Sequence, residues 1–192
     1  VKVIPEARGD IAVALDQAGP AIKVSRHGVD IVVDDGTAPP RKPLFGQAPS
    51  PCQKDGVATA AGVKSVAALP LIVVRTPRRV DLTANGALFG DIGPADAVQL
   101  VNTGCGTWSV GDTYALRLAQ IGDGHIRIGQ GGIVVARLQG SGGIDARRVL
   151  HRLDVFPHGS GLIHVGRADG PLDAEVWGAG RLEVDQGRAG RA

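Results

Sequence analysis

The chain has 192 residues, enough for one domain to bury a core without metal ions or a dense disulfide network. Hydrophobic residues make up 43% but aromatic residues only 3%, so the core must consist of Val, Ile, Leu and Ala, a mixture that favours strands. The 21 basic and 19 acidic residues give a net charge of +2 without a basic cluster, which argues against a nucleic-acid partner, and no apolar stretch is long enough for a membrane helix.

The first 40 residues contain four short stretches in which apolar and polar residues alternate: VKVIP, DIAVAL, AIKVS and VDIVVD. The alternation predicts strands, but their spacing is irregular. We therefore expect residues 1–40 to form irregular N-terminal coils or a cap, with Gly28 as a corner. Because the chain starts at Val1 rather than at a methionine, we expect a start left by removal of a secretory leader or by trimming.

Residues 35–70 form a Pro-rich insertion, which we expect to be a long surface excursion that is functional or mobile. The insertion carries Cys52, and the other cysteine, Cys105, lies in the repeat region described below. Their spacing does not fit a metal site. We expect a disulfide that ties the insertion to the domain body and stabilises it by about 2 to 4 kcal/mol, with two unpaired thiols as the alternative.

Residues 80–185 contain a glycine repeat. Six glycines follow one another at intervals of 18 or 19 residues: Gly86, Gly104, Gly122, Gly140, Gly159 and Gly178. The last five open a Gly-x-Gly tripeptide, which predicts a corner. Seven residues after each first glycine a second turn residue follows, which is glycine in four units and Arg147 or Asp185 in the other two. We therefore expect two corners in each unit.

Apolar residues recur at fixed positions between these corners. Six and four residues before the first glycine, the two columns are Val80, Val98, Leu116, Val134, Leu153, Leu172 and Leu82, Leu100, Leu118, Ala136, Val155, Ala174. After the corner, the columns are Trp108, Ile126, Ile144, Ile163, Leu182 and Val110, Ile128, Ala146, Val165, Val184. The residues between the columns are mostly polar, so each unit contains two half-buried strands.

A unit of this kind cannot bury its apolar face alone, whereas stacked units can. We therefore predict an all-β fold, a β-helix or β-solenoid with about 18–19 residues per coil, as a single domain over residues 1–192 with regular coils at 80–185. A β-sandwich would have unequal strand spacing and no such columns. We expect Arg127, Asp145, His164 and Glu183 to face one another in sequence on the outside, and Asn102 and Gln120 to stack as side-chain amides.

Three apparent motifs do not fit a catalytic or cofactor site. In IGDGHIRIG the third glycine comes seven residues after the first rather than five, and no helix follows, so a dinucleotide site is excluded. Ser141 and Ser160 lack the glycine two residues before a nucleophile elbow. The five histidines do not have metal-ligand spacing and are expected to be solvated: His27, His125, His151, His158 and His164. We assign no catalytic residue, cofactor or metal.

Two outward features could carry function. Asp154 and Asp173 share a column, as do paired carboxylates in β-helix enzymes that cut polysaccharides, although a charged solvated face is the simpler interpretation. Phe156 and Trp177 lie where solvent is expected, together with Val101 and Ile121. We expect Phe156 and Trp177 to form a patch that stacks on sugars or docks a protein.

The last coil ends at DQGRAGRA without an amphipathic helix that could cover its open rung. Because an uncovered rung is an edge that pairs with other chains, we expect either the tail to fold over it or this end to meet another molecule. Self-association through the C-terminal coil is therefore one expected interaction.

The repeat is clearest in VDLTANGALFGDIG, VQLVNTGCGTWSVG, LRLAQIGDGHIRIG, LDVFPHGSGLIHVG and LDAEVWGAGRLEVD. These segments resemble the head GIN domain family, described as autotransporter adhesin heads of bacterial envelopes. The resemblance covers residues 80–185 well and the first third weakly. It implies a right-handed β-helix with Gly-x-Gly corners behind a secretory leader, in the periplasm, at the outer membrane or secreted, and it supplies no catalytic residues. The chain departs from the family in its Pro-rich insertion and at Arg147 and Asp185.

Our leading hypothesis is a non-enzymatic envelope or surface protein, a rigid solenoid scaffold for binding, adhesion or assembly, with envelope polysaccharide or protein as partner. The alternative is a carbohydrate-active β-helix enzyme, a polysaccharide hydrolase or lyase that uses outward carboxylates.

Overall fold

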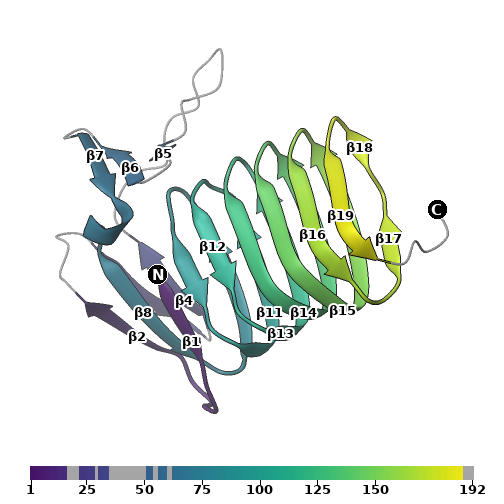
Figure 1. Cartoon of the computed structure of the whole chain (residues 1–192). Coiled ribbons are helices and arrows are strands. Elements are labelled where there is room, and N and C mark those ends of the chain that lie inside the picture. The colour runs from purple at the N-terminus through teal and green to yellow at the C-terminus, as the bar shows by residue number, and fades with distance from the viewer. Residues whose placement is uncertain (17–21, 29, 35–50, 54–55, 60–61, 188–192) are drawn as a thin grey trace.

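The computed structural model describes residues 1–16, 22–28, 30–34, 51–53, 56–59 and 62–187. Within these ranges the regular structure is β, apart from a short 3₁₀ turn, η1 (Val66–Ala68). Figure 1 shows a rod of stacked coils that advances along the chain from the N-terminal third to the yellow strand β19. The prediction of an all-β, right-handed β-solenoid is confirmed, with about six turns.

Two parallel sheets form opposite walls of the rod (Figure 1). The front sheet contains β1 (Lys2–Pro5), β10 (Gly90–Ile92), β12 (Thr107–Val110), the first halves of β14 (His125–Gly140) and β15 (Gly143–Gly159), β16 (Leu162–Ala168) and β19 (Arg181–Gly187). The back sheet contains β9 (Arg79–Ala84), β11 (Ala95–Asn102), β13 (Thr113–Ile121), the second halves of β14 and β15, β17 (Leu172–Ala174) and β18 (Trp177–Gly178).

The predicted apolar columns form the core between the two sheets. In the back sheet, Val98 pairs with Leu116 and Leu100 pairs with Leu118, each exactly one coil apart, and these side chains are at most 3% exposed. In the front sheet, Ile126 pairs with Ile144 in the same way. Because parallel strands lie about 4.8 Å apart, residues in one column contact each other along the whole rod. In the last coil these positions are less buried, because no further described coil covers them.

The first corner of each coil depends on glycine, as predicted. Gly122, Gly140 and Gly159 adopt positive φ values of 124°, 119° and 118°. The corner at Cys105 differs, because there the positive φ belongs to the second glycine, Gly106, at 105°.

The expected second corner is wrong for four coils. Gly129, Arg147, Gly166 and Asp185 lie inside the continuous strands β14, β15, β16 and β19 rather than in turns. The pairing of β14 with β15 shifts register between Gly131 and Ile133, where β15 gains one residue. A bulge of this kind bends a strand without ending it, and it explains why the interval between first glycines changes from 18 to 19 residues.

The N-terminal third caps the rod rather than adding regular coils. Strand β1 enters the front sheet between β10 and β8 (Leu71–Thr76), and β2 (Ala12–Asp16) pairs with β8 in the antiparallel direction. Strands β3 (Lys23–His27) and β4 (Asp30–Asp34) form a separate antiparallel hairpin. Gly28, with a φ of 64°, is therefore in a hairpin turn and not at a solenoid corner.

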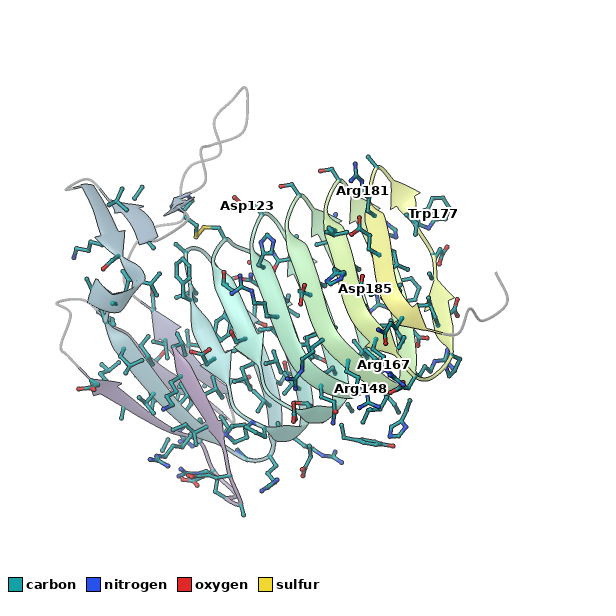
Figure 2. All side chains as sticks on the ribbon, in the orientation of Figure 1. Asp123, Arg148, Arg167, Trp177, Arg181 and Asp185 are labelled. Atoms are coloured by element: carbon teal, nitrogen blue, oxygen red, sulfur yellow. A yellow bond between two sulfur atoms is a disulfide. The ribbon has the colours of Figure 1, made fainter. Side chains whose placement is uncertain are left out.

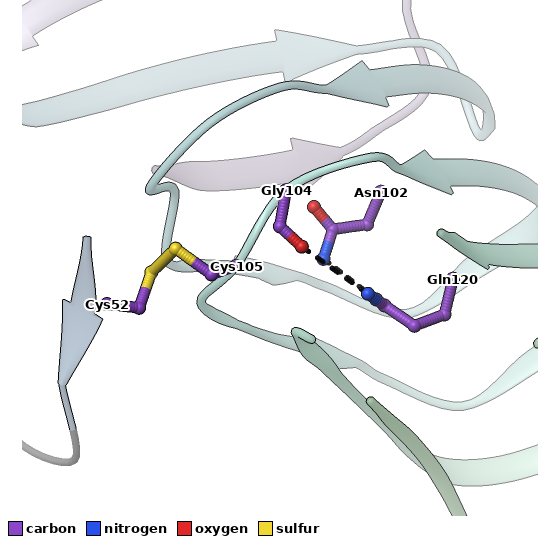
Figure 3. Close-up of a disulfide and its surroundings, with 5 residues drawn as sticks. All are labelled: Cys52, Asn102, Gly104, Cys105 and Gln120. Carbon is purple, nitrogen blue, oxygen red and sulfur yellow. Dashed lines mark hydrogen bonds between the residues drawn. A yellow bond between two sulfur atoms is a disulfide. The ribbon is translucent and has the colours of Figure 1, made fainter. Parts of the chain in front are cut away.

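Part of the Pro-rich insertion folds into a small antiparallel sheet of β5 (Cys52–Gln53), β6 (Gly56–Thr59) and β7 (Gly62–Ser65). Residues 35–50, which contain most of the insertion's prolines, lie outside the described residues. A disulfide joins Cys52 to Cys105, with 5.7 Å between the Cα atoms (Figure 3). The small sheet is thus covalently attached to a first corner of the rod.

The stacked amides expected at Asn102 and Gln120 are present in the core (Figure 3). Both side chains are 0% exposed. Asn102 Nδ2 donates a hydrogen bond of 2.8 Å to Gln120 Oε1, and Gln120 Nε2 donates one of 3.5 Å to the carbonyl of Gly104. The prediction of an amide ladder is confirmed for this pair of coils.

Candidate binding face

The outer side of the front sheet carries a column of charged and polar residues. Arg127 pairs in register with Asp145, Asp145 with His164, and His164 with Glu183, as predicted. The structure extends this column at its N-terminal end through Ser109 and Asp91 to Lys2. The position of Lys2 could not be predicted, because β1 lies outside the 18-residue repeat and its sequence does not indicate which strand it pairs with.

His164 links three neighbouring coils through its two ring nitrogens. Nδ1 lies 2.8 Å from Asp145 Oδ2, and Nε2 lies 3.1 Å from Asp185 Oδ2. His164 is partly exposed and bonded to Asp145, as expected, but its C-terminal partner is Asp185 rather than the register neighbour Glu183. The hydrogen bond that His164 donates to Asp145, and then the one that it donates to Asp185, raise the pKa of His164 above its usual value of 6.5.

We predict that the stability of the last coils depends on pH through His164. Its raised pKa means that the folded chain keeps the proton to a higher pH than the unfolded chain. The stabilisation is fully present below pH 6.5 and is lost as pH rises through the folded pKa. Its size should be about 1 kcal/mol or less, because the pair is partly exposed. NMR titration should give a midpoint above 6.5 that falls in Asp145→Asn, and an unchanged midpoint would contradict the prediction.

Charged side chains of the front sheet also form ion pairs with one another near the lower side of the rod as drawn in Figure 2. Arg148 and Arg167 both contact Asp169, at 2.7 and 2.5 Å. These ion pairs lower the pKa of Asp169, the bond from Arg167 having the larger effect. Figure 2 shows Arg148 and Arg167 close together on this wall. Much of the front sheet's charge is therefore used to connect coils.

The outer side of the back sheet is different, because many of its outward positions are apolar. They are half-buried or exposed: Ala97, Val101, Ala115, Ala119, Ile121, Ile133, Val135, Phe156 and Trp177. We call this surface the back face. An outward apolar surface of this extent on a sheet wall is typical of a binding site. The sequence columns already contained this signal at Val101, Ile121, Phe156 and Trp177.

A shallow groove of about 400 Å³ runs along the N-terminal half of the back face. Ala97, Ala115 and Ile133 form its floor, and they occupy the same column of three neighbouring coils. Arg79 and Arg117 are among its charged lining residues. Sequence analysis did not identify this groove, although the small residues at Ala97 and Ala115 recur at the repeat interval.

The predicted patch lies on the same face, nearer the C-terminal end. Phe156 is half-buried beneath the guanidinium of Arg137, whose Cζ is 5.3 Å from the ring centroid. Trp177 is 56% exposed and lies beside His158, with 6.2 Å between ring centroids. Figure 2 shows Trp177 at the yellow end of the rod. Phe156 and Trp177 are thus on successive coils of one face, each next to a polar side chain.

The outward carboxylates do not form a free pair. Asp154 and Asp173 are register neighbours on β15 and β17, as predicted. However, Arg152 Nε donates to both oxygens of Asp154, at 2.8 and 2.9 Å. One of the two carboxylates that an enzyme would use, Asp154, is therefore held in an ion pair within its own strand.

The remaining motif residues lie at corners. Ser141 and Ser160 are exposed in first corners. In the described part of the chain, no group of three or more His, Cys, Asp or Glu side chains could hold a metal ion. The described ranges also contain no helix that is long and apolar enough to cross a membrane.

Comparison of the chain with protein-family models, curated proteins and solved structures found no match.

Proposed function

We propose that the chain is a non-enzymatic binding protein of the bacterial envelope or cell surface, in which the solenoid is a rigid support and the back face binds the ligand. The observation that carries the proposal is the contrast between the two walls. The front wall uses charged side chains to connect coils, whereas the back face presents apolar side chains, including the half-buried Phe156 and the exposed Trp177.

A rigid support follows from the continuous hydrogen-bonded ladders that run from β9 to β19. Each coil contacts only its neighbours, so the positions of outward side chains are fixed by the spacing of the coils. A surface of this kind suits extended ligands such as a polysaccharide, or a flat protein surface. Aromatic rings such as Trp177 provide a large contact area with little loss of conformational entropy.

The envelope location is supported by the Cys52–Cys105 disulfide and by the resemblance to the head GIN domain family. Disulfides persist in oxidising compartments such as the periplasm and the cell surface.

The proposal is tested with a panel of immobilised envelope and plant polysaccharides. The wild-type chain should be retained on at least one of them, and the double variant Phe156→Ser/Trp177→Ser should bind about tenfold more weakly. Leu162→Ser is the matched control, because Leu162 is a 37% exposed apolar side chain on the opposite wall. Circular dichroism should show the same fold for all three proteins.

Three outcomes would overturn the proposal. Equal loss of binding in Leu162→Ser would show that the back face is not the site, and retention on none of the panel would remove the evidence for a carbohydrate-binding surface. Release of new reducing ends from a polysaccharide, abolished by Asp154→Asn, would show instead that the chain is an enzyme.

A further inference from the structure

We infer that the ligand of the back face is a linear polysaccharide bearing carboxylates, such as a polyuronate, and that it lies along the rod axis in the groove over Ala97, Ala115 and Ile133. This inference rests on the proposed function, since it names the ligand class of the same face. It is carried by the direction of the groove, by its floor and by the charge around it.

The groove runs across the strands and therefore along the rod. Its floor residues come from β11, β13 and β14, which are successive parallel strands about 4.8 Å apart. A pyranose ring is about as long as this spacing, so a polysaccharide along the axis would place one sugar over each coil. The small side chains of Ala97 and Ala115 let a ring approach the sheet closely, and their methyl groups suit the apolar faces of sugars.

The arginines around the groove are not neutralised by the protein. Arg79, Arg117 and Arg137 form no ion pair with any described residue, whereas Arg152 on the same wall is paired with Asp154. The acidic lining residue Asp81 accepts hydrogen bonds from Gln99 and not from an arginine. Guanidinium groups bind carboxylates with two parallel hydrogen bonds, so these unpaired arginines complement an anionic ligand.

The spacing of the arginines also fits a repeating acid. Arg79 is on β9 and Arg117 on β13, two coils apart, which corresponds to about 10 Å along the axis. Two sugars cover the same length, so carboxylates on every sugar or on every second sugar could meet both guanidinium groups. Arg137 on β14 and Phe156 on β15 continue the surface one and two coils further on, where the ring of Phe156 offers an apolar face.

Other macromolecules fit this surface less well. A peptide strand that extends a sheet needs a free edge, but β11, β13 and β14 are paired on both sides. Binding of single-stranded nucleic acid normally uses aromatic rings that stack on bases, and none of the groove-lining residues is aromatic.

The test is isothermal titration of the intact chain with oligogalacturonate, with a neutral cello-oligosaccharide of the same length for comparison. Oligogalacturonate should bind more tightly, and Arg79→Gln/Arg117→Gln should weaken it by at least about tenfold. The matched control is Arg127→Gln/Arg181→Gln, which removes the same charge from exposed positions of the front sheet (Figure 2 labels Arg181). This control should change the affinity by less than about twofold.

Each other outcome decides against the inference. Equal weakening by the front-sheet control would show non-specific attraction by net charge. The chain could instead bind the neutral sugar and not oligogalacturonate, and lose this binding in Phe156→Ser/Trp177→Ser. That result would contradict an anionic ligand and would leave the proposed function standing. Equal affinity for a sulfated oligosaccharide would show that the groove binds anionic sugars in general and does not select carboxylates. Binding of none of these sugars would overturn this inference, while the proposed function would still be decided by the polysaccharide panel.

Discussion

Replacement of Gly140 by alanine should lower the free energy of unfolding by about 4 kcal/mol, for two separate reasons. Its φ of 119° lies in a region that is nearly restricted to glycine, which costs about 1 to 3 kcal/mol for other residues. In addition, a Cβ at this position would lie 2.6 Å from the carbonyl oxygen of Gly122 in the preceding corner. Backbone atoms of one coil would therefore have to move away from the next.

Gly86→Ala separates the two reasons. Gly86 occupies the same corner position three coils earlier and has a φ of 80°, but a Cβ there would meet nothing within 4 Å. Alanine at Gly86 should therefore cost only the backbone strain, about 1 to 2 kcal/mol. Urea denaturation followed by circular dichroism measures both variants. Equal losses in the two would mean that the corners do not approach each other as closely as the structure shows.

The two glycines of a corner are needed for different physical reasons. Gly140 provides the positive φ, whereas Gly142 has no positive φ but would place a Cβ 2.2 Å from the carbonyl of Gly124. The second glycine is thus required by the close stacking of one corner on the next. Because both requirements recur at the corners that begin with Gly122, Gly140 and Gly159, the Gly-x-Gly repeat in the sequence reports this part of the architecture directly.

The regular coils could be predicted because in-register stacking gives each position the same environment in every coil. Leu100 and Leu118 lie one coil apart and are buried in equivalent surroundings, so their column is apolar throughout. Asn102 and Gln120 could be placed opposite each other by the same argument. The 18-residue interval alone thus predicts strand pairing, register and the inner face.

The cap could not be predicted, because it depends on contacts between segments far apart in the chain. Strand β1 lies between β8 and β10, about 70 and 90 residues away, and nothing in VKVIP indicates either partner. Gly28 was expected at a solenoid corner because its flanking sequence resembles a unit. The antiparallel hairpin of β3 and β4 has the same alternation of apolar and polar residues, but its strands are joined by a local turn.

The candidate site was only partly predictable, because strand register fixes the positions of Cα atoms but not the positions of the ends of long side chains. Phe156 and Trp177 could be assigned to the outer surface from their columns. In contrast, His164 reaches Asp185 rather than Glu183, and Arg152 turns along its own strand to Asp154. The groove depends on side-chain size over three coils together, which becomes clear only when the wall is seen as a surface.

Replacement of Gln120 by leucine should cost about 2 to 3 kcal/mol, because the amide of Asn102 would be left in the core without its partner. Leucine fits this column, since the next coil has Leu138 there at 1% exposure. The loss should therefore come from the unpaired amide and not from the shape of the new side chain.

The double variant Asn102→Leu/Gln120→Leu distinguishes these two causes. Replacing both partners by apolar groups of similar size removes the unpaired amide, so the double variant should be within about 1 kcal/mol of the wild type. The double-mutant cycle, measured by urea denaturation, should then give a coupling of about 2 kcal/mol or more between the two sites. A double variant that loses clearly more than about 1 kcal/mol while the coupling stays at about 2 kcal/mol would show that leucine does not fit the column. A coupling near zero would mean that the hydrogen bond between Asn102 and Gln120 contributes no stability, and the pair would then serve only to fix the register of neighbouring coils.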